Sequence, residues 1–85
     1  MLRYTLRQLE YFVAVGEAGS IARASERINV SSPSISAAIA QLEQEFGLPL
    51  FVRQHAQGLS LTQGGRQMME QARLVLREAA AMNDI

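Results

Sequence analysis

Residues 31–41 hold the side chains whose chemistry first suggests a function, because short hydroxyl and amide groups recur there. A serine hydroxyl and a glutamine amide each donate and accept hydrogen bonds without carrying charge. Such groups can pair with base edges in the major groove of DNA, and small apolar groups between them can pack on thymine methyls. The alternative is that they are unobtrusive residues on a solvent-exposed surface. The candidates are Ser31, Ser32, Pro33, Ser34, Ser36, Ala37 and Gln41.

Basic side chains are the second candidate chemistry, since phosphate neutralisation dominates affinity for nucleic acids. All eight are arginines, and eight acidic residues bring the formal net charge to zero. A neutral total argues mildly against a nucleic-acid partner, so the distribution of the arginines matters more than their number. The candidates for contacts to the DNA backbone or the minor groove are Arg53, His55 and Arg66.

Each of these charges has an alternative in plain exposure to solvent. Arg23 and Arg27 either touch the DNA backbone or pair with Glu26 and Glu17. Glu43 is expected to be a structural ion-pair partner. The sequence therefore predicts a few basic contacts and a moderate dependence of binding on salt.

The sequence lacks the residue patterns of a catalytic site or a metal site. There is no Cys, and a single His55 cannot build a metal site without help from carboxylates. No Ser, His and acid stand at a spacing that suggests a catalytic triad. Gly64 and Gly65 open a helix and lack the lysine of a phosphate loop. We therefore expect no enzyme activity, no metal and no cofactor.

A helix over residues 32–46 must present the serine-rich stretch. Ser31 or Ser32 is expected to cap it, and either hydroxyl could also bind phosphate at the positive end of the helix. Pro33 falls in the first turn, where its missing N–H costs nothing, and Gly47 ends the helix. The inward stripe is expected to be Ile35, Ile39, Leu42 and Phe46.

The opposite face of this helix follows from that stripe at about 100° per residue. Ser34 and Ser36 fall on opposite flanks. The side chains that point outward are Pro33, Ala37, Ala40, Gln41 and Gln44. The first two turns of this face are what a recognition helix presents to base edges.

Two helices are expected before it. The first begins at Thr5, whose pairing with Gln8 fits a capping box, and ends near Gly19. The second begins after Ser20. Only Asn29, Val30 and Ser31 separate it from the third helix, which is typical of a helix-turn-helix. The expected apolar positions are Leu6, Leu9, Phe12, Val13 and Gly16 in the first helix, and Ile21, Ala24 and Ile28 in the second.

The sequence of residues 50–85 predicts a small hairpin followed by a long helix. Residues 50–52 and 59–61 read as short strands joined by a polar connector, which forms a wing over residues 50–61. Thr62 is expected to cap a fourth helix that runs almost to Ile85. A helix this long outruns a small domain, so its apolar stripe predicts a homodimer. The dimerisation candidates are Met69, Ala72, Val75, Leu76 and Ala79, although the early part of the stripe, from Met68 to Ala72, could instead pack on the chain's own domain.

Four stretches follow one another in this chain in the order LRQLEYFVAVGEAGS, RASERINVSSPSISAAIAQLEQEFGLPLF, Arg53 and SLTQGG. In this order and spacing the sequence resembles the N-terminal DNA-binding domain of LysR-type transcriptional regulators. The resemblance covers essentially the whole chain and is most specific from Val30 to Phe51. The family more often has Gln at position 32 and Arg or Lys at position 37, where this chain has Ser and Ala.

The resemblance implies a mainly α fold, a winged helix-turn-helix over residues 1–61 followed by a linker helix over residues 62–85 that mediates dimerisation. It implies binding to double-stranded DNA at a promoter inverted repeat. It also implies a C-terminal domain, absent from this chain, through which a small-molecule effector would bind.

Membrane spanning and protein binding are the two remaining functions to weigh. No apolar run approaches the roughly 20 residues that span a bilayer, so a soluble cytoplasmic protein with no membrane partner is the default. The alternative to DNA binding is a helical protein-interaction module, which the neutral charge favours slightly. The polar outward face disfavours that alternative, because protein-binding faces usually carry aromatic or Met anchors.

Overall fold

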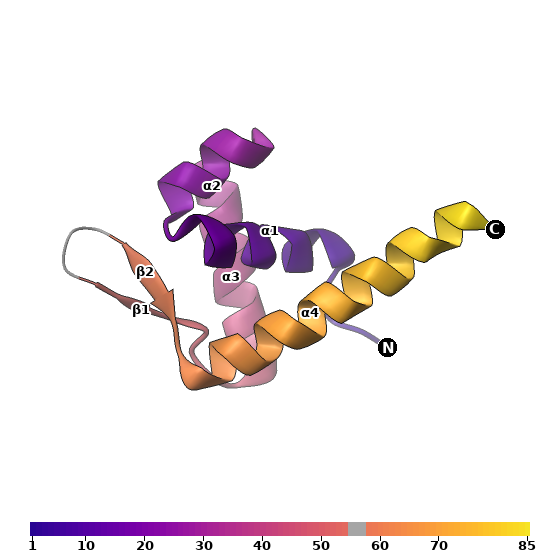
Figure 1. The fold of residues 1–85 in the computed structure, drawn as a ribbon. Helices are drawn as coiled ribbons and strands as arrows, with labels where there is room; N and C mark the ends of the chain where they lie inside the picture. Colours follow the sequence, from indigo (N-terminus) through magenta and orange to yellow (C-terminus); the bar gives the residue numbers. More distant parts are fainter. Residues whose placement is uncertain (55–57) are drawn as a thin grey trace.

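The computed structural model describes residues 1–54 and 58–85, and it shows a winged helix-turn-helix with a long terminal helix. The helices α1 (Leu6–Ala18), α2 (Ile21–Ile28) and α3 (Ser32–Phe46) pack against one another (Figure 1). The strands β1 (Phe51–Arg53) and β2 (Leu59–Leu61) form a hairpin. The last elements are α4 (Gln63–Ala81) and a 3-10 turn, η1 (Met82–Asp84). The predicted fold class is confirmed.

Side-chain caps start each of the four α-helices, as the sequence predicts. Thr5 and Gln8 form both hydrogen bonds of a capping box at α1. Ser20 caps α2, Thr62 caps α4, and Ser31 rather than Ser32 caps α3. These hydroxyls satisfy N–H groups that have no partner inside the helix, which fixes where each helix begins.

The turn between α2 and α3 is held by a left-handed residue and a hydroxyl. Asn29 ends α2 with a φ of 57°, a conformation that Asn adopts more readily than most residues. The Oγ of Ser25 donates to the carbonyl oxygen of Val30 at 2.6 Å. Val30 packs against the core, as expected for the residue that fills the angle of a helix-turn-helix.

The wing is an antiparallel pair in which Phe51, Val52 and Arg53 face Leu61, Ser60 and Leu59. The prediction of a first strand at residues 50–52 is wrong by one position. Leu50 is fully buried instead, with its N–H donated to Glu43 and its carbonyl accepting from Thr62. The wing therefore begins one residue later, and Arg53 belongs to β1.

The core has two clusters, and they correct the predicted faces of α1 and α2. Val15 and Ala18 are buried in α1, whereas Leu6 remains exposed. In α2 only Ala24 is buried, and Ile28 is 36% exposed. The inward face of α1 is therefore rotated from the predicted stripe, because the helix packs on α2, α3 and α4 at once.

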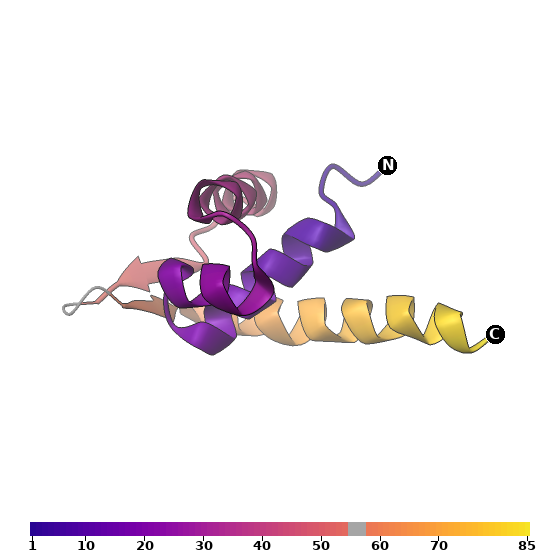
Figure 2. The same ribbon diagram turned by 90° about the horizontal axis from the view of Figure 1, so that it is seen from above.

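The first half of α4 belongs to this core. Met69 and Ala72 are 5% and 2% exposed and lie in the same cluster as Phe12 and Leu42. Gly65 is buried so closely against the carbonyl group of Leu50 that a Cβ atom there would clash with it. The second half of α4 extends past the other helices, as Figures 1 and 2 show.

Candidate nucleic-acid interface

One side of α3 is anchored in the core along most of its length, and the other side is open. Ile35, Ala38, Ile39 and Leu42 are buried, and Phe46 is half-buried against Tyr4. The open side at the start of the helix consists of Pro33, Ser34, Ser36 and Ala37, all exposed, with Ser32 half-buried beside them. The core holds the predicted recognition face rigidly outward.

The hydroxyls at the start of α3 are already connected to one another. Ser31 Oγ accepts from the backbone N–H of Ser34 at 3.3 Å, and the two Oγ atoms lie 2.8 Å apart. Ser31 therefore caps the helix and also orients the side chain of Ser34. Ser36, on the other flank, has an exposed hydroxyl and lies on the same side of α3 as Glu43, whose carboxylate faces the start of the wing.

Gln41 has a partner that sequence reasoning missed. Its Oε1 accepts from Nε2 of Gln8 at 3.0 Å, so a side chain of α1 fixes the amide of α3. The capping box at Thr5 was visible in the sequence, but nothing in the spacing connects residue 8 with residue 41.

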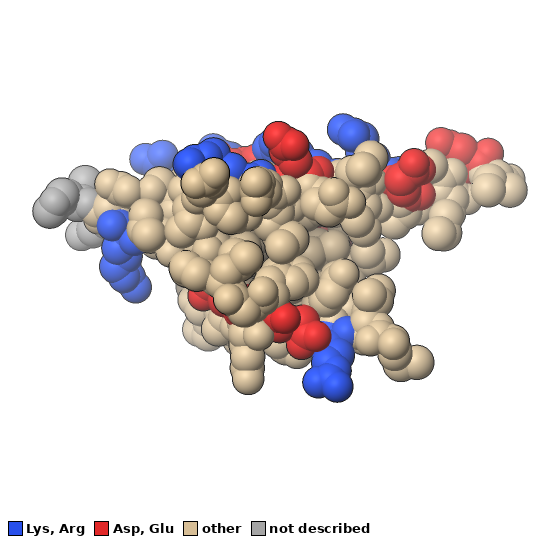
Figure 3. Space-filling view, turned by 90° about the horizontal axis from the view of Figure 1, so that it is seen from below, with Lys and Arg blue, Asp and Glu red and all other residues tan. Residues whose placement is uncertain are grey.

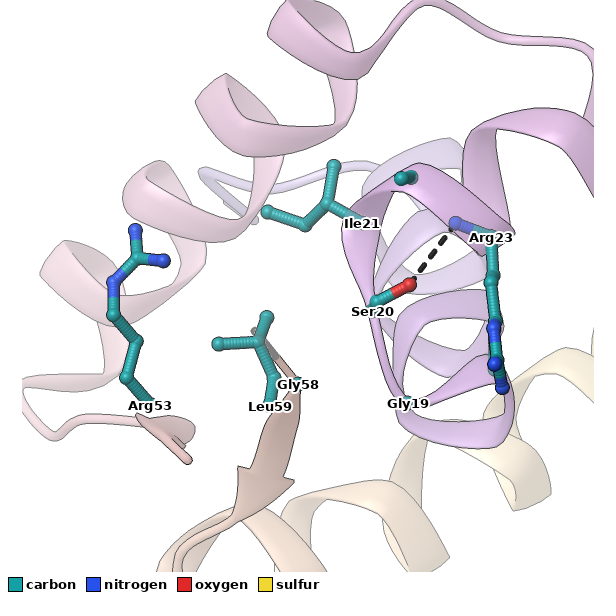
Figure 4. Close-up of a pocket in the computed structure, with 9 residues that line it drawn as sticks. Gly19, Ser20, Ile21, Arg23, Arg53, Gly58 and Leu59 are labelled. Carbon is teal, nitrogen blue, oxygen red and sulfur yellow. Dashed lines mark hydrogen bonds between the residues drawn. The ribbon is translucent and has the colours of Figure 1, made fainter. Parts of the chain in front are cut away.

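A cleft of about 560 Å³ separates the wing from the start of α2. Arg53 lies on the wing side and Arg23 on the α2 side, with Ile21 and Leu59 between them (Figure 4). The wing is tied to this region by a hydrogen bond from the N–H of Leu59 to the carbonyl oxygen of Gly19, at 2.8 Å. Two arginines that lie 30 positions apart in sequence thus border the same cleft from opposite sides.

The predicted ion pairs of α2 and α3 do not form. Within residues 1–54 and 58–85 the one ion pair joins Arg73 to Glu17 at 2.9 Å, so Glu17 is not a partner of Arg23 or Arg27. Glu43 accepts the backbone N–H of Leu50 at 2.7 Å instead of pairing with a cation. Its structural role is therefore to attach the end of α3 to the segment that enters the wing.

Arg66 lies where β2 passes into α4. Its Nη1 donates to the carbonyl oxygen of Leu61 at 3.1 Å, and its side chain is exposed. One hydrogen bond leaves further N–H groups of the guanidinium available for a partner. The predicted contact of His55 falls outside the described residues.

Comparison with known proteins identifies the family of this chain. Residues 6–66 match the family described as "Bacterial regulatory helix-turn-helix protein, lysR family". The chain belongs to the LysR family.

Curated LysR-family relatives include the transcriptional regulator TcbR of Pseudomonas sp. (strain P51), which is 42% identical over 78 residues. That match covers 92% of this chain and 26% of TcbR. ClcR of Pseudomonas putida is 46% identical over 70 residues, covering 82% of this chain and 24% of ClcR. The chain thus spans about a quarter of the length of these relatives.

Solved LysR-family structures have the same fold. The DNA-binding domain of CbnR, solved in a complex with DNA, is 41% identical with a TM-score of 0.88, and the match covers 94% of this chain and 91% of that one. The BenM DNA-binding domain in complex with catB site 1 DNA is 31% identical with a TM-score of 0.86, covering 94% and 85%. Full-length CbnR matches with a TM-score of 0.89 at 41% identity, covering 94% of this chain and 27% of its own.

The last turns of α4 are the second candidate interface of this LysR-family chain, and here the structure corrects the predicted set. Met69 and Ala72 are buried in the chain's own core and cannot meet another subunit. Val75 and Leu76 are half-buried against the same core, and Ala79 is half-exposed. The exposed large apolar side chains beyond Ala72 are Leu74, Met82 and Ile85.

Charges of both signs are spread over the surface. Figure 3 shows a broad neutral area on one face, with acidic groups both near the middle of the molecule and toward the C-terminal end of α4. The acidic residues of that end are Glu78 and Asp84. The other six acidic residues lie elsewhere in the chain, so negative charge is distributed over the molecule.

Two other kinds of site are absent from residues 1–54 and 58–85. None of the helices within these ranges is both long and apolar enough to cross a membrane. The Asp and Glu residues of this described part form no group of three or more that could hold a metal ion.

Proposed function

We propose that this chain is the DNA-binding module of a LysR-family transcription regulator and binds double-stranded DNA with α3 in the major groove. The observation that carries the proposal is the open face at the start of α3, where exposed Pro33, Ser34, Ser36 and Ala37 sit on a helix anchored in the core. Short side chains let the backbone of a helix come close to base edges, and the serines can pair with several bases.

The wing supplies the charge that α3 lacks. Arg53 on β1 and Arg23 on α2 line one cleft, and an arginine on each wall suits the DNA backbone that borders the groove. Arg66, with unused N–H groups beside the wing, would add a further backbone contact. His55 stays a predicted wing contact. A few such arginine contacts in each subunit, doubled in a dimer, would let a chain of zero net charge bind DNA.

Dimerisation through the second half of α4 is the next part of the proposal. Val75, Leu76 and Ala79 form a partly exposed apolar strip, and Leu74 and Met82 extend it. A second copy packed antiparallel on this strip would place two α3 helices at an inverted repeat. The chain would act in the bacterial cytoplasm, and it would act by binding rather than by catalysis.

Selection of bound sequences from random double-stranded DNA tests these statements together. We expect enrichment of an inverted repeat, because each half-site meets one α3 helix of a two-fold symmetric dimer. Enrichment of a single half-site would reject the dimer but keep DNA binding. A pool that stays random, with binding no tighter than to competitor DNA, would reject sequence-specific binding itself.

A further inference from the structure

Gln8 uses both ends of its side-chain amide. Its Oε1 accepts the backbone N–H of Thr5 at 2.9 Å, and its Nε2 donates to Oε1 of Gln41 at 3.0 Å. The Thr5 N–H can only donate, so it requires the oxygen end of the amide. The cap of α1 therefore decides that the nitrogen end of Gln8 faces α3.

This choice fixes the amide of Gln41 in turn. Because Gln8 offers a donor, the oxygen of Gln41 points toward α1, and its own NH₂ group is the end left for a partner. Gln41 is exposed, so that NH₂ group is accessible. A bidentate contact with adenine needs an outward donor and an outward acceptor together, which this orientation does not provide.

The surroundings of Gln41 leave room for a partner. Gln41 follows Ser34 by two helical turns and lies on the same flank of α3. Beside it is an open hollow of about 520 Å³, lined by Arg3, Ala37, Ala40, Gln41, Gln44 and Glu45. Ala37 and Ala40 contribute short side chains to this lining, and Arg3 and Glu45 carry opposite charges.

We infer that Gln8 is a positioning residue that holds Gln41 as a hydrogen-bond donor to an acceptor atom of DNA. The inference rests on the proposed function, because it names the chemistry that one flank of α3 recognises. The acceptor is either a phosphate oxygen or a base-edge acceptor such as O6 or N7 of guanine or O4 of thymine. A side chain outside the recognition helix thus determines what the helix can recognise.

Gln8→Glu is the informative substitution. A glutamate keeps the oxygen that accepts from Thr5, so the capping box and the melting temperature should be retained. It replaces the donor that faces Gln41 with an acceptor, so the Gln41 amide must turn and present its oxygen outward. The change reverses the polarity of Gln41 without touching α3.

The experiment is a double-mutant cycle of Gln8→Glu and Gln41→Leu, with binding measured by fluorescence anisotropy on the selected DNA sequence. We expect Gln41→Leu to weaken binding by about two- to tenfold, the range of one net hydrogen bond. Gln8→Glu should weaken binding more strongly in the wild-type background than in the Gln41→Leu background, by a factor of about two or more. The added negative charge is present in both backgrounds and cancels.

A panel of DNA sites with each base pair changed distinguishes the two sources of the acceptor. If Gln41→Leu relaxes preference at one base pair, a base edge is the acceptor; if it weakens all sites alike, a phosphate is. Equal effects of Gln8→Glu in both backgrounds would overturn the inference, as would a preference for adenine over guanine that depends on Gln41, because the N6 amino group of adenine needs an outward acceptor. Failure of the unmodified chain to bind DNA would instead overturn the proposed function, and the inference with it.

Discussion

The start of α3 and the end of α4 are both open helix surfaces, yet they differ in composition and in support. The open face of α3 is short and polar, and buried residues from Ile35 to Leu42 hold it in place from behind. The end of α4 is partly apolar, and no residue beyond Ala72 is buried. The first surface is rigid and suits a hydrated polar groove, whereas the second lacks a neighbour and suits another apolar helix.

This difference separates three properties of the chain. Substitutions behind α3 should change folding, those on its open face should change DNA binding alone, and those at the end of α4 should change association alone. Four substitutions or pairs of substitutions test that separation, and their expected effects decrease from the core to the surface.

Leu42→Ala should have the largest effect, because it removes the support of α3. Leu42 is fully buried in the core cluster that contains Phe12 and Met69. Large-to-small changes at such sites cost about 2–5 kcal/mol of unfolding free energy, measurable by urea denaturation. Leu74→Ala at an exposed position of α4 is the matched control and, at dilutions where the chain is monomeric, should leave the unfolding free energy nearly unchanged. Similar losses for both would show that the end of α4 is not independent of the core.

Ala79→Glu should come next, and it should act on association. A charge placed unpaired in a closed interface costs on the order of 2–5 kcal/mol, so sedimentation should show monomer at concentrations where the unmodified chain is a dimer. Ala80→Glu makes the same change at the neighbouring, exposed position and should leave the dimer intact. A dimer unaffected by either glutamate would place the interface elsewhere.

Ser36→Glu should reduce DNA binding without a change in stability. The side chain is exposed on the open face of α3, so it meets no core residue. Loss of a base contact costs about 1–3 kcal/mol, which is roughly a five- to 150-fold rise in Kd, and repulsion from phosphate adds to it. Gln71→Glu on the exposed side of α4 carries the same charge change. Equal affinities for the two variants at moderate salt would argue against α3 as the groove-binding element.

The smallest effect should come from the ion pair between Arg73 and Glu17, which connects α4 to α1. Both side chains are about half exposed, at 48% and 50%, so solvent screens their attraction. A double-mutant cycle with alanine at both positions should give a coupling of about 0.2–1 kcal/mol that fades as salt is added. A coupling several times larger would mean that this pair, and not apolar packing, fixes α4 on the domain.

The features that the sequence predicts correctly, the helix caps and the apolar stripe of α3, depend on residues close to one another in the chain. Thr5, Ser20 and Thr62 were identified as caps because a hydroxyl satisfies N–H groups only two or three residues away. The stripe on α3 was recognisable for the same reason, since Ile35, Ile39 and Leu42 share a face by spacing alone.

The features that the sequence does not predict depend on packing between elements that lie far apart in the chain. Met69 and Ala72 fit a dimer stripe by spacing, but α4 packs on α1 and buries them within the same chain. Leu50 is apolar and next to Phe51, so the start of the strand could not be located without knowing that Glu43 accepts its N–H. The contact between Gln8 and Gln41 joins two helices across a sequence separation of 33 residues.

Gly65, which lacks a side chain where α4 passes the Leu50 carbonyl, has a consequence for the DNA that this chain can span. Its close contact fixes the direction in which α4 leaves the domain. In a dimer joined through α4, that direction sets the distance and rotation between two α3 helices, and half-sites must match it in helical turns of DNA. A glycine remote from the proposed recognition face would then determine the half-site spacings at which the dimer can bind DNA.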